Sequence, residues 1–160
     1  QNRKLDKPMQ LYLTGLAEAL RFPDQLPVNG DHHRWEGVQL VEAMAEQHFP
    51  ANRLVWLSPD AEDPLLDLAP SDVYVVGGLV DRSVASGTTL QRAAGGRCCR
   101  LPLKEYAPRR NVHKILSPIA VLEILGAVHS GTSWRDAIVA GLPARYVKRR
   151  DRESCKRQRN

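Results

Sequence analysis

The segment VYVVGGLVDRS, residues 73–83, joins an apolar run to a glycine pair and then to an acid followed by a base. Its first four residues are β-branched or aromatic, which is the composition of a strand covered on both faces. The glycine pair lets the backbone bend sharply or lets a ligand approach main-chain atoms. Asp81 is therefore predicted to lie at the carboxyl edge of a sheet, where open α/β folds bind their ligands.

Strand patterns and helical patterns alternate along the rest of the chain. Three further strands are expected within residues 9–16, 53–58 and 97–103, the first of them running into a helix. Helices are expected within residues 36–49, 86–94, 115–131 and 133–142, the last two capped by Ser117 and Ser133. Residues 21–35 and 104–114 have loop composition, and 59–72 is expected to form two turns around a short helical piece. This alternation predicts one α/β domain with a mainly parallel sheet.

Composition limits the class of protein. The 160 residues are 42% hydrophobic and 26% charged, the balance of an ordinary globular domain. No apolar run reaches the roughly 18 residues that a membrane helix needs, and the first ten residues contain no signal-peptide core. Three cysteines, two of them adjacent, argue against a disulfide framework. We expect an intracellular protein, in the nucleus or cytoplasm rather than the mitochondrion, with no membrane association.

The positive charge is concentrated at one end of the chain. Residues 145–160 hold eight Arg or Lys and two acids, whereas residues 1–144 hold fifteen bases and sixteen acids. A basic tail on a nearly neutral body suggests contact with nucleic-acid phosphates. A solvated terminus is the alternative that composition leaves open.

Several turns follow the predicted strands and could meet at one edge of a parallel sheet. They fall at Ser58, at Gly77–Gly78 and at Leu101–Leu103, and a fourth junction falls at Lys114–Ser117. Ordinary connections between strands and helices would give the same pattern. Asp81 is harder to explain as packing or as a helix cap, which makes it a candidate for proton transfer or for holding a polar ligand.

Other site classes lack their motifs in this chain. It contains no G-x-G-x-x-G opening a helix, no G-x-x-x-x-G-K-[ST] and no G-x-S-x-G. No Cys/His cluster has metal-ligand spacing, so no metal is expected. Cys98 and Cys99 are expected to be structural, one pointing into the core and the other outward. Trp56 and Trp134 are expected in the core, and packing is favoured over base stacking for Trp35.

The motif VYVVGGLVDRS, followed by LPL and HKILS, resembles the tRNA methyltransferases that modify N1 of the purine at tRNA position 9, a branch of the SPOUT superfamily. QLYLTGL and RLVWLSPDAEDPLLDL upstream, and SWRDAIVAGLPARYVKRR downstream, match that family in order and spacing. The resemblance implies a SPOUT fold with a deep trefoil knot near the C-terminus. It places a methyltransferase domain at residues 1–150, lacking the first strand and helix usual in the family, and leaves residues 151–160 as a basic tail.

The resemblance also implies S-adenosylmethionine as cofactor, tRNA as substrate and Asp81 as the general base. The cofactor pocket is implied at sixteen positions: Leu57, Ser58, Gly78, Arg82, Ser83, Val84, Ala85, Ser86, Leu90, Leu101, Pro102, Leu103, Lys114, Ile115, Leu116 and Ser117. Contacts to tRNA are expected from eight arginine and lysine residues: Arg3, Lys4, Arg109, Arg110, Arg145, Lys148, Arg149 and Arg150. Guanine is the expected purine, with adenine left open. A monomer is expected, and the alternative function is a tRNA-binding scaffold in a processing complex.

Overall fold

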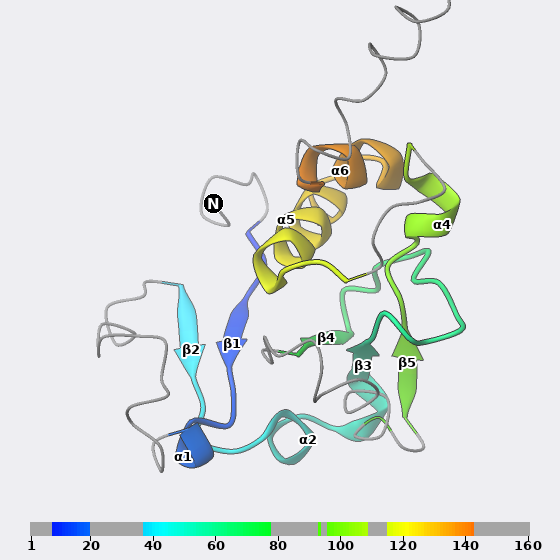
Figure 1. Ribbon diagram of the computed structural model, residues 1–160. Coiled ribbons are helices and arrows are strands. Elements are labelled where there is room, and N and C mark those ends of the chain that lie inside the picture. The colour runs from blue at the N-terminus through cyan, green and yellow to red at the C-terminus, as the bar shows by residue number, and fades with distance from the viewer. Residues whose placement is uncertain (1–7, 20–36, 78–92, 94–95, 109–114, 143–160) are drawn as a thin grey trace, which may run out of the picture.

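The computed structural model describes residues 8–19, 37–77, 93, 96–108 and 115–142 of the chain (Figure 1). The described strands are β1 Leu11–Leu13, β2 Val38–Leu40, β3 Leu54–Leu57, β4 Val73–Val76 and β5 Arg97–Cys99. The α-helices are α1 Leu16–Ala19, α2 Ala45–His48, α4 Leu103–Tyr106, α5 Pro118–His129 and α6 Trp134–Gly141, and Ala51–Arg53 forms a 3-10 turn. Among the described residues, every helix falls short of the length and apolar character needed to cross a bilayer.

All described strands pair in parallel, which confirms the predicted α/β class with parallel pairing. They form two sheets, one of β1 and β2 and one in the order β4-β3-β5. β4 and β5 flank β3, and parallel pairing requires the long connections that separate these three strands in the chain. The trefoil knot implied by the resemblance remains a prediction.

Apolar side chains pack against both faces of the three-stranded sheet. Val55 and Leu57 of β3 point into the larger core, which contains Ile124 and Leu125 of α5 and Ile138 of α6. On the other face, Leu54 and Trp56 form a smaller cluster with Ala93, against which Phe49 packs. Two covered faces explain why β3 is buried at all four positions.

The strand of the opening motif is less buried than its composition predicts. All four residues of β4 are only half-buried, because β4 is an outer strand of the described sheet and β3 takes the central place. The prediction for the cysteines is also corrected. Cys98 packs against the smaller cluster and Cys99 against the larger core, so neither points outward. Burial raises the pKa of both thiols, which is consistent with unreactive, structural cysteines.

The two C-terminal helices form as predicted. The Ser117 hydroxyl accepts a hydrogen bond from the Ala120 N–H at 3.3 Å, and Pro118 begins α5, since proline needs no N–H partner there. The Ser133 hydroxyl accepts one from the Asp136 N–H at 3.2 Å and caps α6. Trp134 is 9% exposed and Trp56 is 6% exposed, so both are core residues as expected.

Three expectations about local structure are wrong. The first half of the helix expected at 36–49 is strand β2, because its main chain pairs with β1 and only Ala45–His48 is helical. Residues 59–72 contain no helix, and Pro64 instead bridges in parallel to Arg100. The loop expected at 104–114 opens with α4, whose first residue, Leu103, is anchored in the core. The loop at 21–35, Trp35 and, apart from Ala93, the helix expected at 86–94 lie outside the described residues.

Candidate active site

The carboxyl ends of β3, β4 and β5 lie at one edge of the sheet. Leu57 is opposite Val76 on one side and Cys99 on the other, so the three strands end level with each other. The described parts of the predicted site follow these ends: Ser58 after β3, Gly77 after β4 and Leu101 after β5. Parallel pairing therefore brings three separated segments to the edge where α/β folds bind ligands.

Ser58 closes the turn that leaves β3. It is 3% exposed, and its N–H donates to the Cys99 carbonyl at 2.9 Å. Its hydroxyl accepts a hydrogen bond from the Asp60 N–H at 3.3 Å, and its carbonyl accepts one from Ala61 at 3.3 Å. These bonds fix the start of the loop, so Ser58 shapes the edge whether or not it contacts a cofactor.

Four of the predicted cofactor residues belong to one apolar cluster. Leu57 and Leu103 are buried members of the larger core, and Leu101 and Leu116 pack against it. Between Leu101 and Leu103, Pro102 is among the most completely buried residues, and the Leu103 N–H donates to the Leu101 carbonyl at 2.8 Å. The structure thus joins segments that are far apart in the sequence into one apolar wall, while their contact with cofactor stays a prediction.

Ile115, Leu116 and Ser117 lead from this wall into α5. Ile115 is 41% exposed, and the Ser117 side chain is occupied as the cap of α5. The Leu116 N–H and carbonyl form no hydrogen bond with any residue that the structure describes. Apolar side chains next to a main-chain donor and acceptor that no described residue occupies suit a ligand with a flat, hydrogen-bonding ring such as adenine, so the described wall fits S-adenosylmethionine.

One ion pair at this edge was not predicted from the sequence. Both carboxylate oxygens of Glu105 accept from the terminal nitrogens of Arg100, at 2.9 and 2.7 Å. The hydrogen bond from Arg100 holds the pKa of the Glu105 carboxyl below its usual range, and the same bond raises the pKa of Arg100. In the sequence, each residue alone resembles an ordinary charged surface residue. The only signal for an ion pair was that Arg100 and Glu105 are five positions apart, with Pro102 between them.

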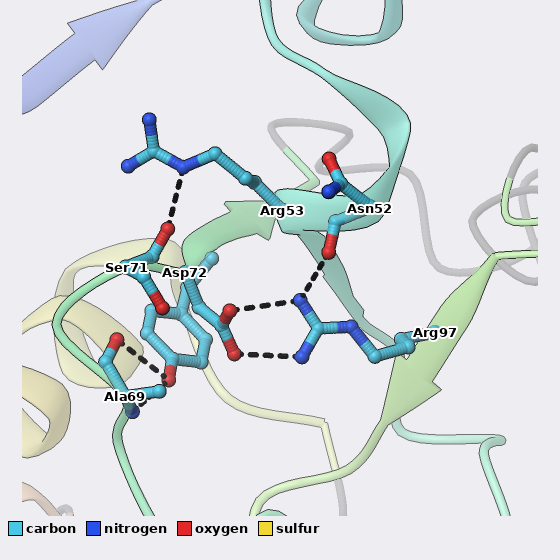
Figure 2. A network of polar contacts seen from close by, with 7 residues as sticks. Asn52, Arg53, Ala69, Ser71, Asp72 and Arg97 are labelled. Carbon is cyan, nitrogen blue, oxygen red and sulfur yellow. Dashed lines mark hydrogen bonds and ion pairs between the residues drawn. The ribbon is translucent and has the colours of Figure 1, made fainter.

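A second network of charged groups holds the opposite, amino edge of the sheet (Figure 2). Arg97 at the start of β5 donates twice to Asp72, at 2.8 Å each, and once to the Asn52 carbonyl at 2.9 Å. Arg53 donates through Nε to the Ser71 carbonyl at 2.6 Å. The hydrogen bond from Arg97 lowers the pKa of Asp72. These residues precede the strands or, like Arg97, begin one, so the network stabilises the sheet away from the candidate site.

The remaining predicted site residues lie outside the part of the chain that the structure describes. They are Gly78, Asp81, Arg82, Ser83, Val84, Ala85, Ser86, Leu90 and Lys114, together with the bases Arg3, Lys4, Arg109, Arg110, Arg145, Lys148, Arg149 and Arg150. Within the described ranges, no three His, Cys, Asp or Glu side chains are grouped so as to hold a metal ion.

Parallel strands and turns buried at their carboxyl ends define an α/β domain, and two crystal structures of spTrm10 share its fold. The crystal structure of spTrm10(74) aligns with a TM-score of 0.75 at 24% identity, covering 89% of this chain and 78% of that one. The complex of full-length spTrm10 with SAH aligns with a TM-score of 0.74 at 23% identity, covering 89% and 76%. At these identities the two structures establish the fold.

The chain belongs to the family of tRNA (guanine(9)-N(1))-methyltransferase TRM10/TRM10A, whose family model matches residues 1–147. It is 33% identical over 149 residues to tRNA methyltransferase 10 homolog B of Rattus norvegicus, covering 88% of this chain and 47% of that protein. It is 30% identical to tRNA (guanine(9)-N(1))-methyltransferase Trmt10A of Drosophila melanogaster, covering 90% and 46%. The chain therefore spans about half the length of the curated relatives it matches. The family resemblance in the sequence motifs is confirmed.

Proposed function

We propose that this chain is the catalytic domain of a tRNA methyltransferase that uses S-adenosylmethionine to methylate N1 of the purine at tRNA position 9, guanine being the expected purine. The observation that carries the proposal is the family match over residues 1–147. The meeting of Leu57, Leu101, Leu103 and Leu116 in one apolar cluster supports it, since these residues come from three of the segments expected to bind cofactor. The full-length spTrm10 structure contains SAH, the product form of the same cofactor.

The chemistry gives Asp81 a definite task. N1 of guanine carries a proton and is a poor nucleophile until that proton leaves, whereas N1 of adenine carries none. An aspartate with an ordinary pKa of about 3.9 is ionised at neutral pH and can accept a proton within hydrogen-bond reach. S-adenosylmethionine supplies the methyl group when bound. Position 9 lies within folded tRNA, so binding is proposed to draw the base out of its stack.

The rest of the proposal concerns substrate contact and location. Residues 1–150 are proposed as the methyltransferase domain and 151–160 as a basic tail. Arginine and lysine side chains on both sides of residue 150 are proposed to bind tRNA phosphates. The domain is proposed to bind tRNA as a monomer, which sedimentation velocity of the mixture would check. A nuclear or cytoplasmic rather than a mitochondrial location is also proposed, and the free thiols of Cys98 and Cys99 support its intracellular, reducing character alone.

Mass spectrometry of tRNA nucleosides tests the activity directly. Three transcripts that differ only in guanine, adenine or cytosine at position 9 would be incubated with the protein and S-adenosylmethionine. We expect N1-methylguanosine from the first transcript and no product from the cytosine control. Binding of both tRNA and S-adenosylhomocysteine without methylation of either purine would instead indicate a scaffold, and absence of S-adenosylhomocysteine binding would overturn the cofactor assignment.

A further inference from the structure

The turn Leu101–Pro102–Leu103 is bracketed by the Arg100–Glu105 ion pair. The guanidinium of Arg100 lies at the carboxyl end of β5, and the carboxylate of Glu105 belongs to α4, which starts where the turn ends. The two hydrogen bonds, at 2.9 and 2.7 Å, use both terminal nitrogens and both oxygens. Such a two-point contact fixes orientation as well as distance, which a single charge contact does not.

The arginine end of this pair is tied to the segment between β3 and β4. The Arg100 N–H donates to the Asp63 carbonyl at 2.9 Å, and the Arg100 carbonyl accepts from Leu65 at 2.8 Å. The guanidinium also reaches the Leu101 carbonyl at 3.5 Å, inside the turn itself. Because Arg100 follows β5 directly and both of its main-chain groups bond to residues 63–65, its contact with Glu105 ties α4 to this fixed point on the other side of the turn.

Partial burial makes Arg100 depend on Glu105, the carboxylate to which its guanidinium donates hydrogen bonds. The Arg100 side chain is 12% exposed and that of Glu105 is 32% exposed. The Arg100 Nε is buried and has no hydrogen-bond partner among the described residues. A guanidinium removed from water needs its remaining donors satisfied, so losing the carboxylate would favour movement of the side chain toward solvent. The turn would then lose the contact that joins its two ends.

We propose that the Arg100–Glu105 pair is a positioning pair that holds the Leu101–Leu103 turn in the conformation needed to bind the adenosyl ligand. The inference rests on the proposed function, because it assigns a task to the wall of the same site. Neither residue needs to contact the ligand. Their effect is on the affinity for the cofactor, since without the ion pair the turn must be ordered each time the ligand binds.

The pair can be broken at either end with little change in size. Glu105→Gln removes the charge at the more exposed position, and Arg100→Lys keeps the positive charge but lacks the two-point geometry. Asp72→Asn is the matched control, because it breaks the other two-point pair, with Arg97, at the amino edge of the same sheet. For each variant, calorimetry would give the dissociation constant of S-adenosylhomocysteine, thermal unfolding the stability, and single-turnover assays the rate at saturating cofactor.

We expect both Glu105→Gln and Arg100→Lys to weaken S-adenosylhomocysteine binding by about tenfold, the scale of one hydrogen bond to a charged group, with the saturated rate unchanged. Asp72→Asn should lower the melting temperature and leave the dissociation constant unchanged. Unchanged affinity in Glu105→Gln, or an equal loss in Asp72→Asn, would overturn the positioning role while the unaltered protein still binds and methylates. If the unaltered protein binds no S-adenosylhomocysteine, the proposed function fails and this inference with it.

Discussion

Gly141, the last residue of α6, lets that helix approach α5 closely. A Cβ placed on Gly141 would lie 2.5 Å from Cγ1 and 3.1 Å from Cδ1 of Ile124. Ile124 is 0% exposed and surrounded by the larger core, so its side chain has no free space into which it could turn. Gly141→Ala must therefore separate the two helices or force Ile124 out of its rotamer.

The expected cost follows from two opposing effects. Overpacking a core costs about 1–3 kcal/mol, whereas replacing glycine by alanine within a helix gains up to about 1 kcal/mol. Gly141 is at the helix end, so only part of that gain applies. We expect Gly141→Ala to lower the free energy of unfolding by about 1–2 kcal/mol.

Urea denaturation of a double-mutant cycle would isolate the contact. Ile124→Ala alone removes both clashing carbons and should cost about 2–5 kcal/mol through the cavity it leaves. In that background Gly141→Ala should be neutral or slightly stabilising, because its methyl group enters the space vacated. Gly96→Ala is the control for adding a methyl group to a glycine without a close clash, since the nearest atom to its Cβ would be the Ala93 carbonyl oxygen at 3.4 Å. The same cost for Gly141→Ala with and without Ile124 would refute the packing argument.

Three further predictions concern chemistry and charge. Asp81→Asn should slow single-turnover methylation of guanine by roughly 10²- to 10⁴-fold and that of adenine less, and equal losses would indicate that Asp81 positions the base rather than accepting its proton. Asp72 has a lowered pKa through its bond to Arg97, so its contribution to stability is present above the ordinary pKa of about 3.9 and is lost as pH falls through the folded value. The melting-temperature difference between the unaltered protein and Asp72→Asn should accordingly vanish in strong acid and persist at neutral pH. Neutralising residues 148–150 should weaken tRNA binding and flatten its salt dependence by up to about 0.9 per phosphate contact, without changing purine preference, whereas superimposable salt slopes would show a merely solvated tail.

Local chemistry was enough to predict the helices and strands that are marked by cap residues or by apolar runs within their own segments. Ser117–Pro118 and Ser133 mark the starts of α5 and α6, because cap residues satisfy main-chain donors whatever the rest of the protein does. The apolar runs of β3 and β4 were recognised for a similar reason, since short runs of β-branched, aromatic and aliphatic residues bounded by turns suit a strand.

Elements whose conformation depends on a distant partner were predicted wrongly. Val38–Leu40 has helical periodicity with the residues that follow, but its main chain pairs with Leu11–Leu13, and that pairing outweighs a weak local preference. Cys98 and Cys99 were expected on opposite faces, one inward and one outward, from strand alternation alone. Alternation tells which face a side chain takes, but the covering of each face depends on helices from elsewhere in the chain.

The sequence by itself determined the family, the parallel α/β class and the segments expected to form the site, because these depend on ordered motifs and on local pattern. Only the tertiary structure decided that Leu57, Leu101, Leu103 and Leu116 form one wall, since the pairing of β3 with β5 and the packing of the segments that follow bring them into one core. It also decided that Arg100 meets Glu105 across the turn, with Arg100 fixed by main-chain bonds to Asp63 and Leu65. Such contacts join residues through space, and no pattern along the chain encodes the distance between them.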